Sequence, residues 1–166
     1  MLISAMEKLH IRKGKPEDIP AVLALVKELA EYERAPQEVI NTEELMLADG
    51  FGSNPCYGFF VAELNQEIVG IALHYIRYST WKGKMLFLED IVVKEHLRGK
   101  GIGKKLFEAC ALLAQEKKYA GMTWQVLDWN EPAINFYKKY NSTLDPEWIN
   151  GKLMAAQIEK LNLSHD

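Results

Sequence analysis

The spacing of apolar residues in the first part of the chain predicts one strand and two helices. Lys8 to Arg12 is expected to form a short strand, and Pro16 follows at a position that favours the first turn of a helix. Apolar residues then recur at helical spacing, at Ile19, Val22, Leu23, Val26, Leu29 and Ala30. Thr42 is a good N-cap and is followed by two glutamates, so a second helix is expected from there to about Gly50.

The pattern changes in the middle of the chain, where β-branched and aromatic residues dominate. Three consecutive antiparallel strands are expected over Tyr57 to Leu64, Glu67 to Tyr78 and Met85 to Val93. Turn residues separate them, and Asn65-Gln66 forms the tight turn between the first two strands.

The second half of the chain predicts a strand-helix-strand crossover. The expected elements are a helix from Ile102 to about Lys118, a strand from Met122 to Asp128, a short helix from Glu131 to Lys139 and a last strand from Lys152 to Glu159. Such a crossover implies a parallel strand pair. The resulting order, βααβββαβαβ, predicts one α/β (α+β) domain over residues 1–166, with a core at about 8–160 and a mixed sheet.

Charge and composition exclude several classes of partner. The formal net charge is -3, so no excess of basic residues is available to neutralise a nucleic-acid backbone. A small cationic substrate fits this charge better. No apolar stretch approaches the roughly 20 residues that a membrane span needs, and the N-terminal run is short for a signal sequence, so a cytoplasmic protein without membrane contact is expected.

Cysteine and histidine spacing gives no metal-site pattern. Cys56 and Cys110 do not form a CxxC pair, and the four histidines lack the spacing of metal ligands. We therefore expect reduced thiols and no metal ion.

The strongest chemical signal is the run Arg98-Gly99-Lys100-Gly101-Ile102-Gly103, between an apolar strand and an amphipathic helix. Glycines let successive backbone N–H groups turn toward one concavity, and the helix N-terminus adds unpaired donors. Pyrophosphate suits such a loop. A Walker loop would need a hydroxyl where Lys105 stands, and a Rossmann loop would follow the first strand. A plain glycine-rich turn remains the alternative.

The strand Leu88-Glu89-Asp90-Ile91-Val92-Val93, followed by Arg98-x-x-Gly101-x-Gly103, resembles the acetyl-CoA motif of the GNAT N-acetyltransferases. Further strings, from about Leu9 to Lys160, resemble the spermidine/spermine N1-acetyltransferase and thialysine N-acetyltransferase (diamine acetyltransferase) branch. They are Tyr32-Glu33, Asp49-Gly50-Phe51-Gly52, Tyr78-Ser79-Thr80-Trp81-Lys82-Gly83, Leu88-Glu89-Asp90, Trp129-Asn130-Glu131-Pro132 and Asn135-Phe136-Tyr137.

The resemblance implies a GNAT fold, in which a mostly antiparallel sheet has helices on both faces and a splayed strand pair holds CoA. In that fold the strand carrying Ile91, Val92 and Val93 pairs with pantetheine as with a new strand. The pyrophosphate site implied for acetyl-CoA comprises Arg98, Gly99, Lys100, Gly101, Ile102 and Gly103, with Lys104 nearby. Residues implied beside the CoA arm are Asn130, Glu131, Pro132, Ala133 and Tyr137.

The family positions also imply two catalytic groups. Glu89 would accept a proton from the substrate amine, directly or through water, and Tyr137 would protonate the departing CoA thiolate. Strand alternation predicts Asp90 on the opposite face from Glu89. The alternatives are a solvent-facing strand carboxylate and a helix tyrosine that only packs on the sheet.

The resemblance implies that a set of acidic and aromatic residues selects the substrate. Tyr32 and Glu33 match the polyamine-contacting pair of the branch, and Tyr32 and Trp124 offer cation–π faces. Glu147 adds a further anionic group, and Glu33 is otherwise part of a solvated helix face.

The sequence therefore predicts direct transfer of acetyl from acetyl-CoA to a small diamine, polyamine or thialysine-like amine, in a ternary complex without an acyl-enzyme. The alternatives are a regulatory acetyl-CoA-binding module and an acetyltransferase acting on protein lysines or N-termini. The resemblance also implies a homodimer.

Overall fold

The computed structural model describes residues 9–161 and 163. They divide into two compact units, one ending at Gln125 and one beginning at Val126. The helices and strands of the first unit are β1 (Leu9–Lys13), α1 (Ile19–Tyr32), α2 (Glu43–Phe51), β2 (Gly58–Leu64), β3 (Glu67–Ser79), β4 (Gly83–Val93), α3 (Ile102–Glu116) and β5 (Gly121–Trp124). The second unit contains α4 (Glu131–Lys138) and α5 (Ala155–Glu159).

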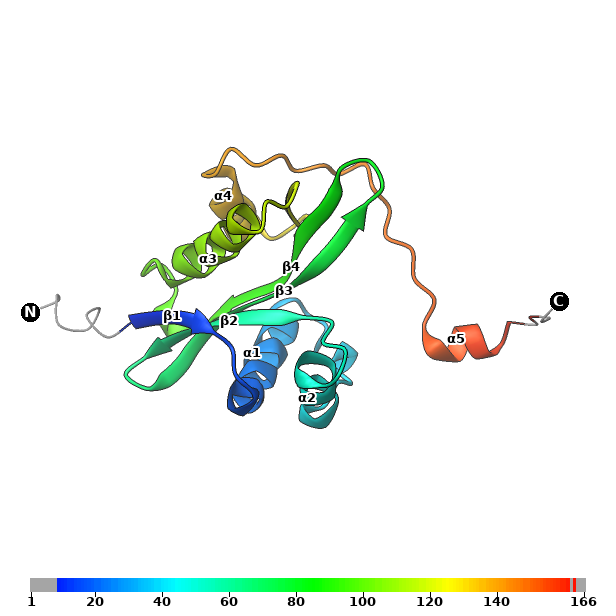
Figure 1. The fold of residues 1–166 in the computed structure, drawn as a ribbon, viewed down its shortest axis with the longest axis horizontal. Coiled ribbons are helices and arrows are strands. Elements are labelled where there is room, and N and C mark those ends of the chain that lie inside the picture. Colours follow the sequence, from blue (N-terminus) through cyan, green and yellow to red (C-terminus); the bar gives the residue numbers. More distant parts are fainter. Residues whose placement is uncertain (1–8, 162, 164–166) are drawn as a thin grey trace, which may run out of the picture. The chain divides into compact units, whose positions relative to one another are not determined.

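The first unit is built on a five-stranded sheet in the order β1-β2-β3-β4-β5 (Figure 1). Strands β1 to β4 are antiparallel neighbours, and β5 joins β4 in parallel after the α3 crossover. The predicted mixed, mostly antiparallel sheet is thus confirmed. Asn65 and Gln66 have φ angles of 52° and 69°, as the two central residues of the β2–β3 turn.

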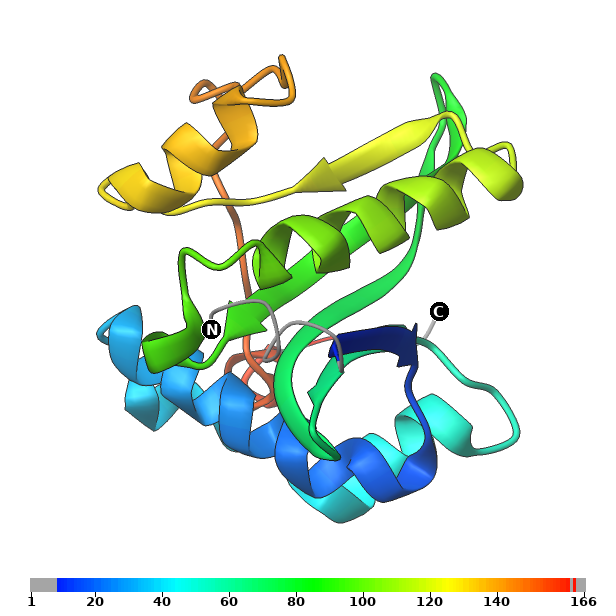
Figure 2. The same ribbon diagram turned by 90° about the vertical axis from the view of Figure 1, so that its left-hand side faces the viewer.

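Helices cover both faces of this sheet (Figure 2). On one face α1 and α2 pack on the strands, in a core whose most buried members include Ile19, Val22, Val61 and Ile71. On the other face α3 buries an apolar stripe of Ile102, Leu106, Phe107, Cys110 and Ala114. The sequence predicts the first four, whereas the predicted fifth member, Leu113, is only partly buried.

Local hydrogen bonds stabilise the first turns of α1 and α2, the two helices that line the site. The Leu45 N–H donates to the Thr42 Oγ1 at 3.2 Å, so Thr42 is the N-cap of α2, as predicted. At the start of α1 the Arg12 guanidinium donates to the Asp18 carboxylate at 2.7 Å. Burial raises the pKa of Asp18, but hydrogen bonds from Arg12 and the Lys15 N–H outweigh it and leave that pKa below its ordinary value.

Two predicted strands differ in the structure. The strand predicted from Met122 to Asp128 ends at Trp124, which pairs with Leu88 just before β4 becomes irregular. The strand predicted from Lys152 to Glu159 is wrong, because its second part is helix α5. Alanine and glutamine are strong helix formers, and the Met154 N–H donates to the Gln157 Oε1 at 2.8 Å at the start of the helix.

Candidate functional site

The irregularity in β4 is a β-bulge at Glu89. Asp90 pairs with Leu73 and Leu88 pairs with His74, so Glu89 is an extra residue with no partner of its own on β3. The two carboxylates were expected on opposite faces of the strand, and this prediction is wrong because both line the same cavity. A bulge interrupts the alternation of side chains and redirects them locally. The bulge at Glu89 therefore places the Glu89 and Asp90 carboxylates at the same cavity.

A third carboxylate is close to this pair. Glu33 directly follows α1, and burial raises its pKa. The pKa of Asp90 is raised to about 6, first by burial and then by the negative charges of Glu89 and Glu33. None of the three takes part in the ion pairs found among the described residues. The site is thus a partly buried anionic cluster that lacks a cation.

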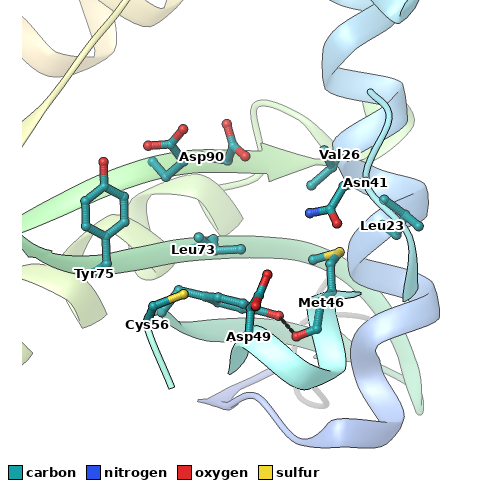
Figure 3. Close-up of a pocket in the computed structure, with 11 residues that line it drawn as sticks. Leu23, Val26, Asn41, Met46, Asp49, Cys56, Leu73, Tyr75 and Asp90 are labelled. Carbon is teal, nitrogen blue, oxygen red and sulfur yellow. Dashed lines mark hydrogen bonds between the residues drawn. The ribbon is translucent and has the colours of Figure 1, made fainter. Parts of the chain in front are cut away.

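Glu89 and Asp90 both line a cavity of about 470 Å³ between the sheet and the two helices on that face, with Asp90 at one end in Figure 3. Its apolar lining comprises Leu23, Val26, Met46 and Leu73. Its other polar residues are Asn41, Asp49, Cys56, Tyr57 and Tyr75. An apolar wall with a few convergent polar groups is typical of a small-molecule site.

One of these residues, Tyr75, interacts directly with a predicted catalytic group. The pKa of Tyr75 is raised by burial and by its interaction with the Glu89 carboxylate. Tyr75 on β3 therefore lies close to Glu89. No sequence motif indicated this contact, because it depends on the register between β3 and β4.

The edge of β4 beyond the bulge is open to a ligand. In the described part of the chain, β5 pairs with Met85 to Leu88 only, whereas β4 continues to Val93. The backbone groups of Ile91 to Val93 on that side therefore have no β5 partner. This is the arrangement expected for a strand pair that splays around pantetheine.

The glycine-rich loop follows this edge and fits a diphosphate. Gly99 and Gly101 have φ angles of 75° and 82°, a conformation that suits glycine, and Gly101 is the N-cap of α3. A Cβ built at either position would meet no other atom within 4 Å, so the space beside the loop is open. The α3 N-terminus adds unpaired N–H groups and a favourable dipole.

Arg98 connects this loop to the end of α1. Its Nε donates to the Val93 carbonyl at 3.1 Å, and its guanidinium lies 5.2 Å from the centre of the Tyr32 ring. Tyr32 thus already has a protein cation over its ring. Trp124, the other predicted cation–π residue, packs edge-on against Phe107 of α3 at 5.4 Å. Their proposed contacts with substrate remain predictions.

The remaining predicted residues belong to the second unit. Asn130 is the N-cap of α4, where its Oδ1 accepts a hydrogen bond from the Ala133 N–H at 3.3 Å. Tyr137 is 5% exposed, and its ring lies 5.3 Å from that of Phe136. Glu147 is exposed, and its N–H donates to Asp145. The parts these residues play toward CoA and substrate stay predictions.

Two further features bear on binding partners. Among residues 9–161 and 163, no three His, Cys, Asp or Glu side chains are placed to hold a metal ion. In the same residues, no helix has the length and apolar character to cross a membrane.

The raised pKa of Asp90 predicts a pH-dependent stability. Because the folded pKa lies above the ordinary value of 3.8, the stability associated with this group is present at low pH and is lost as pH rises from about 4 to 6. Asp90→Asn should therefore raise the free energy of unfolding by about 1 to 2 kcal/mol at pH 7.5 and change it little at pH 4. Urea unfolding at both pH values measures this, with Glu44→Gln, an exposed carboxylate on α2, as the control. A loss of stability at pH 7.5 in Asp90→Asn would contradict the account.

Comparison with known proteins agrees with this geometry. The profile of the acetyltransferase (GNAT) family matches residues 22–141. A thialysine N-epsilon-acetyltransferase from Bos taurus is 43% identical over 141 residues, covering 80% of this chain and 83% of the relative. A protein of the same name from Caenorhabditis elegans is 32% identical, covering 93% and 98%.

A solved structure gives the same fold. An aminoglycoside N-acetyltransferase in complex with CoA superposes with a TM-score of 0.70 at 19% identity, over 87% of this chain and 94% of that chain. The open β4 edge, the glycine loop at a helix N-terminus and these matches lead to one conclusion. The chain belongs to the GNAT family and is an acetyl-CoA-dependent N-acetyltransferase.

Proposed function

We propose that the enzyme acetylates the primary amine of a small diamine, polyamine or thialysine-like substrate. The observation that supports this most directly is the carboxylate cluster of Glu89 and Asp90, which line the cavity, and Glu33, whose charge acts on Asp90; none of the three forms an ion pair among the described residues. An ammonium group would relieve the repulsion within this cluster. The names of the two thialysine acetyltransferase relatives agree with such a substrate.

The cluster also suits the proton transfer that the reaction requires. An alkylammonium with a pKa near 10.4 has no lone pair, and neutralising it at pH 7 costs about 4 to 5 kcal/mol. Glu89 accepts this proton, directly or through water, while Asp90 and Glu33 keep the amine in place. Tyr75 lies close enough to the Glu89 carboxylate for the two groups to interact.

Transfer is direct in the proposed mechanism. The loop from Arg98 to Gly103 with Lys104 holds the pyrophosphate, and the Ile91 to Val93 edge holds pantetheine, so the thioester reaches the bulge from the β5 side. Burial raises the pKa of Cys110 to about 12, and no histidine lines the cavity beside Cys56. Neither thiol is therefore activated for an acyl-enzyme. Tyr137 protonates the thiolate that leaves.

The experiment that tests this function follows free thiol release with acetyl-CoA and a panel of amines. Small diamines and thialysine-like amines should give values of kcat/KM at least 10-fold above those of a lysine-containing peptide, because a short cationic chain matches the carboxylates and the apolar wall of the cavity. Acetyl-CoA alone should leave the protein mass unchanged. A preference for the peptide would favour a protein acetyltransferase, and binding without turnover would favour a regulatory module.

A homodimer is the second part of the proposal. The second unit exposes several large apolar side chains, which are Trp148, Ile149, Leu153, Met154, Ile158, Leu161 and Leu163. Exposed apolar runs of this kind mark interaction surfaces. We expect a dimer by sedimentation equilibrium, and conversion to monomer by the double change Trp148→Ser and Ile149→Ser. Leu112→Ser on α3 is the control, and an unchanged dimer in the double variant would contradict this interface.

A cytoplasmic location, where acetyl-CoA is available, completes the proposal.

A further inference from the structure

The cavity extends beyond the carboxylates that hold the amine. Leu73 separates Asp90 from Asp49 in the view of Figure 3, and Asn41 lies on the same side of the cavity as Met46. A substrate whose amine is bound at Glu89 and Asp90 therefore has an apolar wall along its chain and two polar side chains farther on. This far end is formed by α2 and the loop that precedes it.

Asp49 offers an uncommitted negative charge at this end. Its side chain makes no hydrogen bond or ion pair with the described residues, although its backbone carbonyl accepts from the Cys56 N–H at 2.8 Å. The nearby Tyr57 hydroxyl donates to the Met46 carbonyl at 2.5 Å, so it is not available to Asp49. Burial and the charge of Asp49 raise the pKa of Tyr57 to about 12, which indicates that this carboxylate lies close to the half-buried phenol.

Asn41 offers the complementary group. Its Oδ1 accepts a hydrogen bond from the Thr42 N–H at 2.9 Å, which fixes the orientation of the amide. Its NH₂ group consequently faces away from the backbone, and in Figure 3 the nitrogen points toward Leu73. The Tyr57 hydroxyl is engaged with the Met46 carbonyl. The Asn41 NH₂ makes no hydrogen bond to the described residues and is available as a donor to a ligand.

We propose that Asp49 and Asn41 bind the α-amino-acid head of the acceptor, Asp49 taking its ammonium group and Asn41 its carboxylate. This inference rests on the proposed function, because it assumes that the reacting side-chain amine is held by Glu89 and Asp90. It narrows the substrate class from any diamine to an amino acid with a terminal side-chain amine. A polyamine could also bind Asp49, but only an amino acid supplies a carboxylate to the Asn41 NH₂.

The test uses four amines that differ only in the head group. L-Lysine carries both head groups, cadaverine lacks the carboxylate, ε-aminocaproate lacks the α-ammonium, and pentylamine lacks both. Initial rates of thiol release give kcat/KM for each, and mass spectrometry with fragmentation identifies the acetylated nitrogen. The wild-type enzyme should favour lysine over pentylamine by at least 100-fold, with the acetyl group on the side-chain nitrogen.

Two isosteric variants assign each head group to its residue. Asp49→Asn should lower the ratio of kcat/KM for lysine over ε-aminocaproate by about 10- to 100-fold, because the two substrates differ only in the α-ammonium. Asn41→Asp keeps an acceptor for the Thr42 N–H but replaces the NH₂ donor by a second carboxylate oxygen. It should raise the ratio of cadaverine over lysine by at least 10-fold. Glu44→Gln, on α2 but outside the cavity lining, should change neither ratio.

Alkylation of Cys56 provides a binding measurement that does not need turnover. Cys56 is exposed and lines the cavity, whereas Cys110 is buried, so iodoacetamide should modify Cys56 selectively. Lysine should slow this reaction more than pentylamine does, and Asp49→Asn should reduce the difference, because the α-ammonium then loses its charge partner while Asn41 is unchanged. Protection by lysine without any acetylation would overturn the proposed function while supporting the head-group site. Equal effects of Asp49→Asn and Asn41→Asp on all four amines would overturn the head-group site while leaving the acetyltransferase function intact.

Discussion

Gly101→Asp is expected to abolish the stabilisation of the fold by acetyl-CoA. At a hundredfold excess over its dissociation constant, acetyl-CoA should raise the free energy of unfolding by about 2.7 kcal/mol. Gly101 caps α3 with a φ of 82°, and no other atom lies within 4 Å of a Cβ at this position. An aspartate would therefore place its carboxylate in the open space beside the loop, where it would repel the pyrophosphate. Thermal unfolding with and without acetyl-CoA measures the loss.

Gly83→Asp is the matched control for backbone strain. Gly83 also has a positive φ, of 93°, and a Cβ there would likewise meet no atom within 4 Å, but it begins β4 far along the strand from the loop. Both substitutions should destabilise the protein without ligand by a similar amount. Only Gly101→Asp should lose the response to acetyl-CoA. A folded Gly101→Asp protein with unchanged CoA affinity would disprove the phosphate-loop assignment.

Tyr137→Phe is expected to lower kcat by between about 10- and 10⁴-fold while leaving acetyl-CoA binding nearly unchanged. The lower figure applies if water replaces the phenol, and the upper one is the ceiling for a single acid catalyst. Because only one oxygen atom is removed, the helix that carries Tyr137 should keep its packing. Single-turnover kinetics with saturating acetyl-CoA measures the chemical step.

Tyr140→Phe is the corresponding control in the same unit. Tyr140 also packs against Phe136, with the ring centres 5.7 Å apart. Removing its hydroxyl therefore measures the structural effect of a Tyr→Phe change in similar surroundings. A purely structural Tyr137 would instead lose about 1 to 3 kcal/mol of stability through a stranded hydrogen-bond partner, with little change in kcat. That outcome would show that Tyr137 is not the acid that protonates the departing thiolate.

Much of the first unit could be predicted because local signals agree with its tertiary structure. Thr42 caps its helix, Asn65-Gln66 turns between two strands, and the β4-α3-β5 crossover is parallel as expected. The strand predicted at residues 152–159 was wrong because few tertiary contacts constrain this segment. Those side chains are exposed, so no burial pattern constrains them, and helix propensity decides.

The candidate site divides in the same way. The glycine loop and Glu89 could be found from the sequence because a motif carries them. The joint presentation of Glu89 and Asp90 depends on a bulge, and a bulge depends on the register with β3, which alternation cannot reveal. Asp49 belongs to the family string Asp49-Gly50-Phe51-Gly52, but the sequence assigned it no role. Asn41 belongs to none of the family strings. Only the folded cavity brings these residues to one surface.

The most direct test of the central claim is a crystal structure with a bisubstrate analogue in which CoA is joined through an acetyl linker to the side-chain amine of lysine. The linked nitrogen should lie within about 3.2 Å of a Glu89 or Asp90 carboxylate oxygen, or one water molecule away from it. The pyrophosphate should contact the backbone N–H groups of residues 99–103. A nitrogen bound away from Glu33, Glu89 and Asp90, with the cavity empty, would contradict the proposed acceptor site.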